Sequence, residues 1–126
     1  MKTRYIAALA LVSGFGLGAV SVQTLHAQAK PPAYTIAEIE VKNPAEYQKY
    51  IDGTGLAVPA AGGRFLVRGG RTFVINGSPP KRIALIEWPS FEKGRAYHES
   101  EAYRKFIPIR DSSSDFRGFV IEGMAR

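Results

Sequence analysis

Four short stretches of the chain alternate between apolar and polar residues with a period of two. The stretches are residues 34–41, 64–68, 82–88 and 116–122. This period is typical of β-strands with one buried face. Residues 71–75, which read RTFVI, are strand-like as well and follow a Gly69-Gly70 pair that predicts a bend or bulge.

Between the first two strands, apolar residues recur with helical spacing. Asn43 is a good N-cap, and Pro44 suits the first helical position because its missing N–H has no partner there. The apolar stripe consists of Tyr47, Tyr50 and Ile51. Gly53 and Gly55 each weaken a helix by about 1 kcal/mol relative to Ala. We therefore expect this helix to falter near them.

A second helical segment follows the third strand. Ser90 is its expected N-cap, and the segment continues to Tyr97. A restart at Ser100 predicts a further helical piece, which we expect Pro108 to disrupt. Residues 111–115 read as a polar loop before the last strand.

The resulting order, β-α-β-β-α-β over residues 34–124, predicts an α+β domain of ferredoxin-like type. A four-stranded antiparallel sheet would carry helices on one face. The opposite face would hold Ile36, Leu66 and either Leu85 or Trp88, a set too apolar to leave in water. We therefore expect a homodimer that buries this face.

Residues 1–29 have the three parts of a bacterial secretory signal: Lys2 and Arg4, an apolar run, and small residues before the cleavage point. Cleavage is expected after Ala29, with Ala27 as the alternative. This predicts a periplasmic or secreted protein that leaves the membrane after cleavage. An uncleaved membrane anchor is the alternative interpretation.

Composition excludes several kinds of chemistry. The chain has no cysteine, so neither disulfides nor Cys-ligated metals can form, and outside the leader His98 is the only histidine. Without Lys2 and Arg4 the net charge falls from +6 to +4, which is mild for a soluble domain. We expect no metal site, no cofactor and no nucleic-acid partner.

Several short motifs in order give the chain a resemblance to a known family. They are NPAEY at 43–47, GGRFLVRGG at 62–70, IEWPSF at 86–91, Tyr97 with Ser100 and Tyr103, Arg110, and VIEG at 120–123. The chain resembles the bacterial family called domain of unknown function 1330, in the dimeric α+β barrel group of ferredoxin-like proteins. The resemblance implies a fold and a dimer, and no reaction. The sequence departs from the family where SEAY at 100–103 replaces a more typical Ser-Pro-Glu-Tyr.

Arg68 and Glu87 are the first candidates for a ligand site, because they fall on strands expected to pair. If both pointed into the space between two sheets, Arg68 would offer a planar fork to a carboxylate and Glu87 could take up a proton. The alternative is a structural ion pair between them. Glu38 is a second candidate carboxylate, with an exposed sheet-edge charge as its alternative.

Further candidates lie in the second helical segment. Tyr97, Ser100 and Tyr103 fall within two turns and could line a cleft with hydroxyls, although such tyrosines are often core residues. Arg110 could hold an anion or join the helix end to Asp111. His98 is expected to be structural and on the surface.

Two hypotheses follow for function. The first is a homodimer whose cleft binds a small anionic or carbonyl-bearing molecule, with enzymatic activity left open. The second is a non-catalytic interaction or assembly module that uses its sheet surface only for protein contacts.

Overall fold

Four strands and four helices form two layers in residues 30–126, which are the residues that the computed structural model describes. The expected leader and its cleavage point at Ala29 lie outside them. In order, the elements are β1 (Ala33–Val41), α2 (Pro44–Ala60), β2 (Arg64–Arg68), β3 (Arg82–Trp88), α3 (Phe91–Glu99), α4 (Glu101–Arg104), α5 (Ile107–Ser113) and β4 (Ser114–Glu122).

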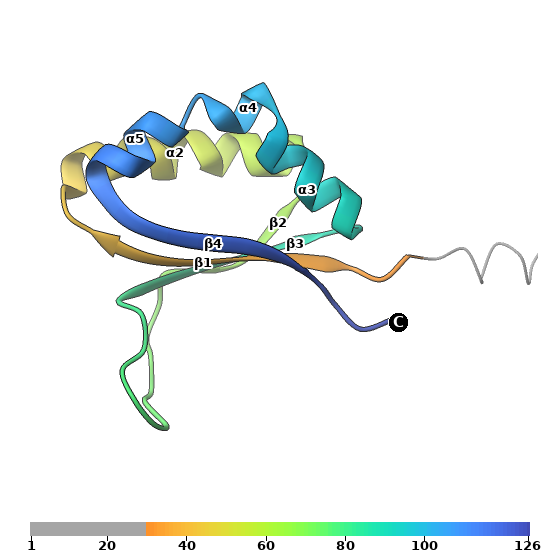
Figure 1. Cartoon of the computed structure of the whole chain (residues 1–126), viewed down its shortest axis with the longest axis horizontal. Coiled ribbons are helices and arrows are strands. Elements are labelled where there is room, and N and C mark those ends of the chain that lie inside the picture. Colours follow the sequence, from red (N-terminus) through yellow and green to blue (C-terminus); the bar gives the residue numbers. More distant parts are fainter. Residues whose placement is uncertain (1–29) are drawn as a thin grey trace, which may run out of the picture. The chain divides into compact units, whose positions relative to one another are not determined.

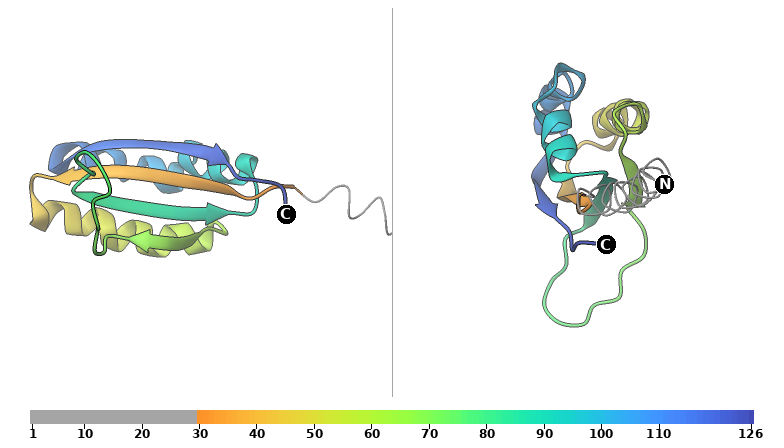
Figure 2. Two further views of the ribbon diagram at one scale, coloured as in Figure 1. Left: turned by 90° about the horizontal axis from the view of Figure 1, so that it is seen from below. Right: turned by 90° about the vertical axis from the view of Figure 1, so that its right-hand side faces the viewer.

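The strands form one antiparallel sheet in the order β2-β3-β1-β4. All the helices cover the same face of this sheet, and the opposite face is uncovered (Figures 1 and 2). The predicted α+β, ferredoxin-like βαββαβ arrangement is confirmed. Among residues 30–126, no helix is long and apolar enough to span a membrane.

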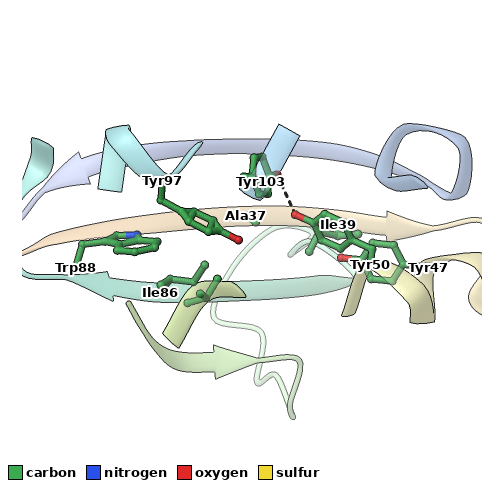
Figure 3. Close-up of a cluster of buried hydrophobic side chains, with 9 residues drawn as sticks. Ala37, Ile39, Tyr47, Tyr50, Ile86, Trp88, Tyr97 and Tyr103 are labelled. Atoms are coloured by element: carbon green, nitrogen blue, oxygen red, sulfur yellow. Dashed lines mark hydrogen bonds between the residues drawn. The ribbon is translucent and has the colours of Figure 1, made fainter. Parts of the chain in front are cut away.

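The period of two in β1 separates the two faces of the sheet. Ala33, Thr35, Ala37 and Ile39 are buried against the helices, whereas Ile36 faces outward. Figure 3 shows the core that results between the layers. Its buried members are Ala37, Ile39, Tyr47, Tyr50, Val58, Ile86, Trp88, Tyr97 and Tyr103. Trp88 therefore belongs to the core, and Leu85 lies on the outer face.

Helix α2 begins as expected, since the side chain of Asn43 accepts a hydrogen bond from the N–H of Glu46 at 3.3 Å. The expectation that it would falter at Gly53 and Gly55 is wrong, because the helix is continuous to Ala60. A Cβ at Gly53 would lie 2.2 Å from the Phe106 ring. The missing side chain lets α2 pack closely on the α4–α5 segment, and this packing offsets the low helix propensity.

The bend in β2 occurs earlier than its glycines suggest. Phe65 pairs with Ile86 and Val67 with Leu85, so Leu66 is an extra, bulged residue. The bulge reverses the alternation after it, because one inserted residue turns the following side chains to the other face. Arg68 consequently faces the helices.

The segment between β2 and β3 differs most from expectation. Residues 71–75 were predicted to be strand-like, but the structure has no strand between Arg68 and Arg82. Gly69, with φ of +76°, turns the chain out of the sheet. We call residues 70–81 the arm. It extends from the sheet on the side opposite the helices (green in Figure 1; right view of Figure 2).

The end of the helical layer also differs from expectation. Pro108 begins helix α5 instead of disrupting a helix, and the predicted loop at 111–115 is absent, because α5 runs to Ser113 and β4 starts at once. The Ser113 hydroxyl donates to the Ile109 carbonyl at 2.5 Å, and the Ser114 hydroxyl donates to the Arg110 carbonyl at 2.6 Å. These bonds satisfy carbonyls that a helix end leaves free.

Candidate functional site

The hollow best suited to a small molecule lies on the helix side of the sheet, beside the edge strand β4. We call it the outer cleft, and its volume is about 420 Å³. Its lining residues are Thr35, Phe91, Arg95, His98, Glu99, Tyr103, Ile107, Arg110, Phe116, Gly118, Phe119 and Val120. The volume falls within the range of ordinary ligand pockets, and apolar walls with a few polar groups are typical of them.

The walls of the outer cleft follow from local structure. Phe91, Arg95 and His98 are spaced four and three residues apart, so they share one face of α3, and this face turns toward β4. Ser90 fixes the start of α3 by accepting the N–H of Lys93 at 3.3 Å. On β4, the Phe116 ring occupies the space beside Gly118, where an added Cβ would lie 2.7 Å from it.

His98 lies at the inner end of the cleft in a short hydrogen-bonded chain. Its Nε2 is 2.8 Å from the hydroxyl of Thr35, and that hydroxyl accepts the indole N–H of Trp88 at 2.9 Å. Burial and the nearby positive charge of Arg110 lower the pKa of His98 to about 4. The imidazole is therefore neutral at neutral pH. Its Nδ1 has no hydrogen-bond partner among the described residues.

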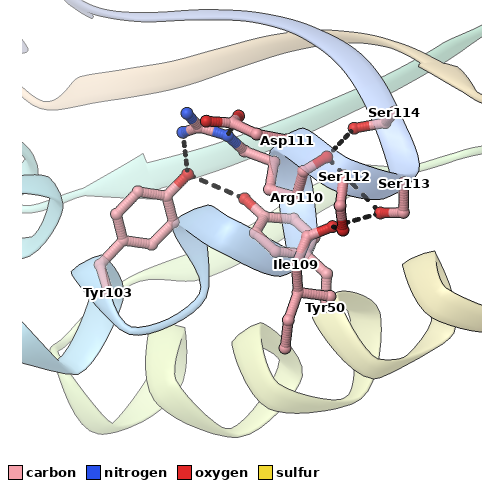
Figure 4. Close-up of polar contacts among 8 residues, drawn as sticks. All are labelled: Tyr50, Tyr103, Ile109, Arg110, Asp111, Ser112, Ser113 and Ser114. Carbon is pink, nitrogen blue, oxygen red and sulfur yellow. Dashed lines mark hydrogen bonds and ion pairs between the residues drawn. The ribbon is translucent and has the colours of Figure 1, made fainter.

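Arg110 supplies a cation to the cleft, and Figure 4 shows its polar contacts. Its Nε donates to Asp111 at 2.9 Å and its Nη1 donates to the hydroxyl of Tyr103 at 3.1 Å. The guanidinium also lies over the ring of Phe116, 4.6 Å from the ring centroid. Two of its five N–H groups are thus used, and the other three have no hydrogen-bond partner within the described residues.

The Tyr103 hydroxyl extends this network into the core, because it lies 2.9 Å from the hydroxyl of Tyr50. Burial, with the neighbouring Tyr103, raises the pKa of Tyr50. The Tyr50 hydroxyl consequently remains a neutral hydrogen-bonding group. A smaller space deeper in the molecule lies beside the two tyrosines.

That deeper space, the inner cavity, has a volume of about 40 Å³. It shares Thr35, His98, Tyr103 and Phe116 with the outer cleft. Its volume would hold about three water molecules. Two buried polar atoms of its lining residues, the hydroxyl of Tyr97 and Nε of Arg82, have no hydrogen-bond partner in the described chain.

The unpartnered hydroxyl of Tyr97 is unusual, because most buried polar groups find a partner. Burial, with a smaller contribution from Tyr103, raises the pKa of Tyr97 to about 12. Figure 3 shows its hydroxyl pointing away from the Trp88 ring and into the space toward Tyr50. The inner cavity thus contains a neutral, unused donor.

Two cations lie at the far end of the inner cavity. Arg68 donates to the carbonyl of Ile51 and lies 4.4 Å from the centroid of the Phe65 ring. Burial raises the pKa of Tyr47, and the charge and hydrogen bond of Arg82 oppose that rise. Within residues 30–126, neither arginine has a carboxylate partner.

The expected Arg68–Glu87 pair does not form. Glu87 lies on the outer face, where Arg64 contacts it at 3.0 Å, whereas Arg68 faces the helices because of the bulge at Leu66. Glu38 also lies on the outer face and pairs with Arg117 across the sheet. Each carboxylate thus has a cationic partner on a neighbouring strand.

The remaining candidates divide between the two spaces. Tyr103 and Arg110 line the outer cleft together, and Tyr97 lines the inner cavity. Ser100 lines neither, because its hydroxyl donates to the Tyr97 carbonyl at 2.6 Å and ends α3. The structure therefore joins two of these four candidates, Tyr103 and Arg110, in one hydrogen-bonded network, and the Tyr97 hydroxyl takes no part in it.

Three residues of the site were not predicted. His98 was expected on the surface, but it is partly buried, and its spacing from Phe91 and Arg95 was the available signal. Thr35 was assigned only to a strand face. Arg82 carried no signal, because it opens a strand like many surface arginines. No group of metal-ligating side chains occurs within residues 30–126.

The chain belongs to the family called domain of unknown function 1330, which matches residues 32–124. No curated protein matches it.

Solved structures with the same fold include a protein of unknown function from Rhodopseudomonas palustris, with 14% identity and a TM-score of 0.62, over 84% of this chain and 94% of that chain. A hypothetical Arabidopsis thaliana protein has 16% identity and a TM-score of 0.58, over 78% and 93% of the chains. A Bacteroides thetaiotaomicron protein described as a possible oxidoreductase has 13% identity and a TM-score of 0.51, over 75% and 100%. At these identities the likeness shows the fold alone.

Proposed function

We propose that the chain is an exported homodimeric protein that binds a small organic molecule in the outer cleft. The molecule would carry an apolar body and a carboxylate or carbonyl group. The observation that supports this most strongly is the combination, in one hollow of about 420 Å³, of apolar walls with the guanidinium of Arg110.

Arg110 is the anchor of this proposal because it is held in place before a ligand arrives. Its side chain is only 19% exposed, and contacts with Asp111, Tyr103 and Phe116 fix its orientation. A guanidinium fixed in this way loses little conformational entropy when a carboxylate binds. The apolar body of the ligand would contact the Phe91 and Ile107 side chains.

His98 gives the site its second polar group. Its imidazole is neutral at neutral pH, so it offers Nδ1 as an uncharged hydrogen-bonding atom. The proposal is one of binding, and it leaves open whether a reaction follows. Tyr97 and Arg68 would act only on a ligand that reaches the inner cavity.

The first test is a thermal-shift titration with benzoate, followed by larger aromatic and aliphatic carboxylates. We expect at least one carboxylate to raise the melting temperature, and Arg110→Gln to weaken its binding at least tenfold by loss of a charge-assisted hydrogen bond. The matched control is Arg104→Gln, a change on the exposed side of α4. If no carboxylate shifts the wild type, or Arg110→Gln responds like Arg104→Gln, the site is wrong.

The homodimeric part of the proposal is supported by the uncovered outer face of the sheet. Leu66, Val67, Phe119 and Ile121 each leave 39% or more of their surface exposed there. A contiguous apolar surface of this kind favours a protein contact. The same surface also supports the second hypothesis, an assembly module without a ligand. The carboxylate titration distinguishes the two hypotheses, because only the first expects a carboxylate to bind.

Export rests on residues 1–29, which lie outside the described residues. We propose cleavage after Ala29, giving a mature protein that begins at Lys30. Intact-mass measurement of the protein recovered from the bacterial periplasm tests this directly. A mass that retains the leader would support the membrane-anchor alternative instead.

A further inference from the structure

The arm, residues 70–81, exposes large apolar side chains. Phe73 and Ile75 are 91% and 94% exposed, and Val74 between them is 51% exposed. Single exposed apolar residues are ordinary, but three in a row at the end of a projecting segment mark a contact surface.

The backbone of the arm also lacks hydrogen bonds to other backbone groups within the described chain. The last backbone hydrogen bond before it joins the Gly69 N–H to the Ile83 carbonyl at 2.9 Å. Within the described chain, no backbone hydrogen bond to another backbone group begins or ends at residues 70–80. A segment rich in β-branched and aromatic residues, without a partner strand, is suited to add to the edge of another sheet.

The sheet offers a free edge of the right kind. Within residues 30–126, the nine-residue strand β4 pairs only with β1, so its other side presents N–H and C=O groups that no described strand pairs with. Exposed edges of this length are usually protected, because they pair readily with another strand. Phe119 and Ile121 of β4 are each 49% exposed and place apolar surface next to this edge.

The direction of the arm indicates which molecule provides the edge. The arm extends on the side of the uncovered sheet face, away from the helices (Figures 1 and 2). Its base, residues 78–81, lines one hollow together with residues of the chain's own β1 and β4. A second copy packed on the uncovered face would therefore meet the arm, and two-fold symmetry would form the contact twice.

We propose that the arm of each copy adds as a strand to the free edge of β4 in a second copy of this chain, with Phe73 and Ile75 as its apolar anchors. This inference rests on the homodimer of the proposed function. The contact of the arm with β4 would also affect the ligand site, because β4 forms one wall of the outer cleft through Phe116, Gly118 and Val120. The partner's arm would border the open side of the cleft, so each ligand site would include both copies.

Cysteine cross-linking tests this placement cleanly, because the chain contains no cysteine. Val74→Cys and Phe119→Cys are made in two differently tagged copies of the full sequence and co-expressed. We expect oxidation to join the two tags in a mixed dimer at least ten times more efficiently than in the control pair, Val74→Cys with Ala102→Cys on the exposed side of α4. Cross-linking at the control level would overturn the proposal, and so would preferential joining to Leu66→Cys on the other edge strand.

Sedimentation separates this inference from the proposed function. The Phe73→Ser/Ile75→Ser variant should raise the dimer dissociation constant at least tenfold, whereas Leu56→Ser on α2, an exposed leucine away from the sheet, should not change it. A monomeric wild type would overturn both proposals. A variant that dimerises like the wild type would overturn the arm alone, and failure of carboxylates to bind would overturn the ligand alone. Binding of the arm to phosphatidylglycerol vesicles without the mixed dimer would assign it to a membrane surface and overturn the inference.

Discussion

His98 makes the stability of the folded chain depend on pH. Burial and the charge of Arg110 lower its pKa to about 4, against 6.5 for a free imidazole. Between pH 4 and 6.5 the unfolded chain therefore binds more protons than the folded chain, and the free energy of unfolding rises with pH. We expect the contribution of His98 to be complete above pH 6.5 and to be lost as pH falls toward 4, a difference on the order of 3 kcal/mol.

Urea unfolding at pH 7 and pH 5 measures this dependence, and His98→Gln is the control. The variant has no imidazole to protonate, while its amide can still bond to the Thr35 hydroxyl. The wild type should lose more stability than the variant between the two pH values. Equal losses would mean that carboxylates alone account for the pH dependence.

The Tyr97 hydroxyl predicts a substitution that stabilises the protein. It is buried without a hydrogen-bond partner in the described chain, and such a group costs about 1–3 kcal/mol. Tyr97→Phe should therefore raise the free energy of unfolding by about 1 kcal/mol. The comparison is Tyr103→Phe, which removes bonds to Tyr50 and Arg110 and should destabilise. A loss of stability in Tyr97→Phe would indicate that the hydroxyl has a partner in solution.

Helix α2 depends on a close approach at one of its two interior glycines. An alanine at position 53 would place its Cβ within the ring of Phe106, whereas at position 55 it would meet only the flexible end of Arg68. Overpacking costs about 1–3 kcal/mol, and a gain of about 1 kcal/mol in helix propensity opposes it.

Gly53→Ala should therefore lower the free energy of unfolding by up to about 2 kcal/mol, and Gly55→Ala should leave it unchanged or raise it. Thermal unfolding of the two variants, monitored by circular dichroism, tests the contrast. Equal effects would show that the contact with Phe106 does not hold the helices together.

Most helices and strands of this fold were predictable, because hydrophobic periods of two and 3.6 residues depend only on residues close together in the sequence. Residues 64–68 and 82–88 are strands with the predicted bounds. The bulge at Leu66 was not predictable, since nothing in RFLVR distinguishes a bulged residue from a paired one. That single residue decides which face Arg68 occupies. Arg68 and Glu87 therefore neither face one space nor form the alternative ion pair, although both strands were predicted correctly.

The candidate site was likewise predicted only where its residues lie close together in the sequence. Tyr103 and Arg110 lie seven residues apart in one helical region, and the sequence alone placed both among the candidates. The contact of His98 with Thr35 joins residues 63 positions apart, and only the packing of α3 on β1 creates it. Likewise, the predicted loop at 111–115 became helix and strand because serine hydroxyls bond to the last carbonyls of α5.

The whole molecule has two unlike faces, and its assembly should depend on only one of them. The helices cover the inner face of the sheet, whereas the outer face combines exposed apolar side chains with the ion pairs of Glu38 and Glu87. Within residues 30–126, each of these two carboxylates has a cationic partner. Two such faces can therefore meet without burying an uncompensated charge, which would be costly.

Ile121→Glu should break this self-association. It places one carboxylate from each copy in the apolar contact, and desolvation and mutual repulsion both oppose binding there. We expect the dimer dissociation constant, measured by sedimentation velocity, to rise at least tenfold. Leu56→Glu is the matched control, because it puts the same charge on an exposed leucine of α2, away from the sheet. Folding should survive in both variants, since each side chain is solvent-exposed in the single chain. A dimer that persists in Ile121→Glu but dissociates in Leu56→Glu would place the contact on the helical layer instead of the uncovered face of the sheet.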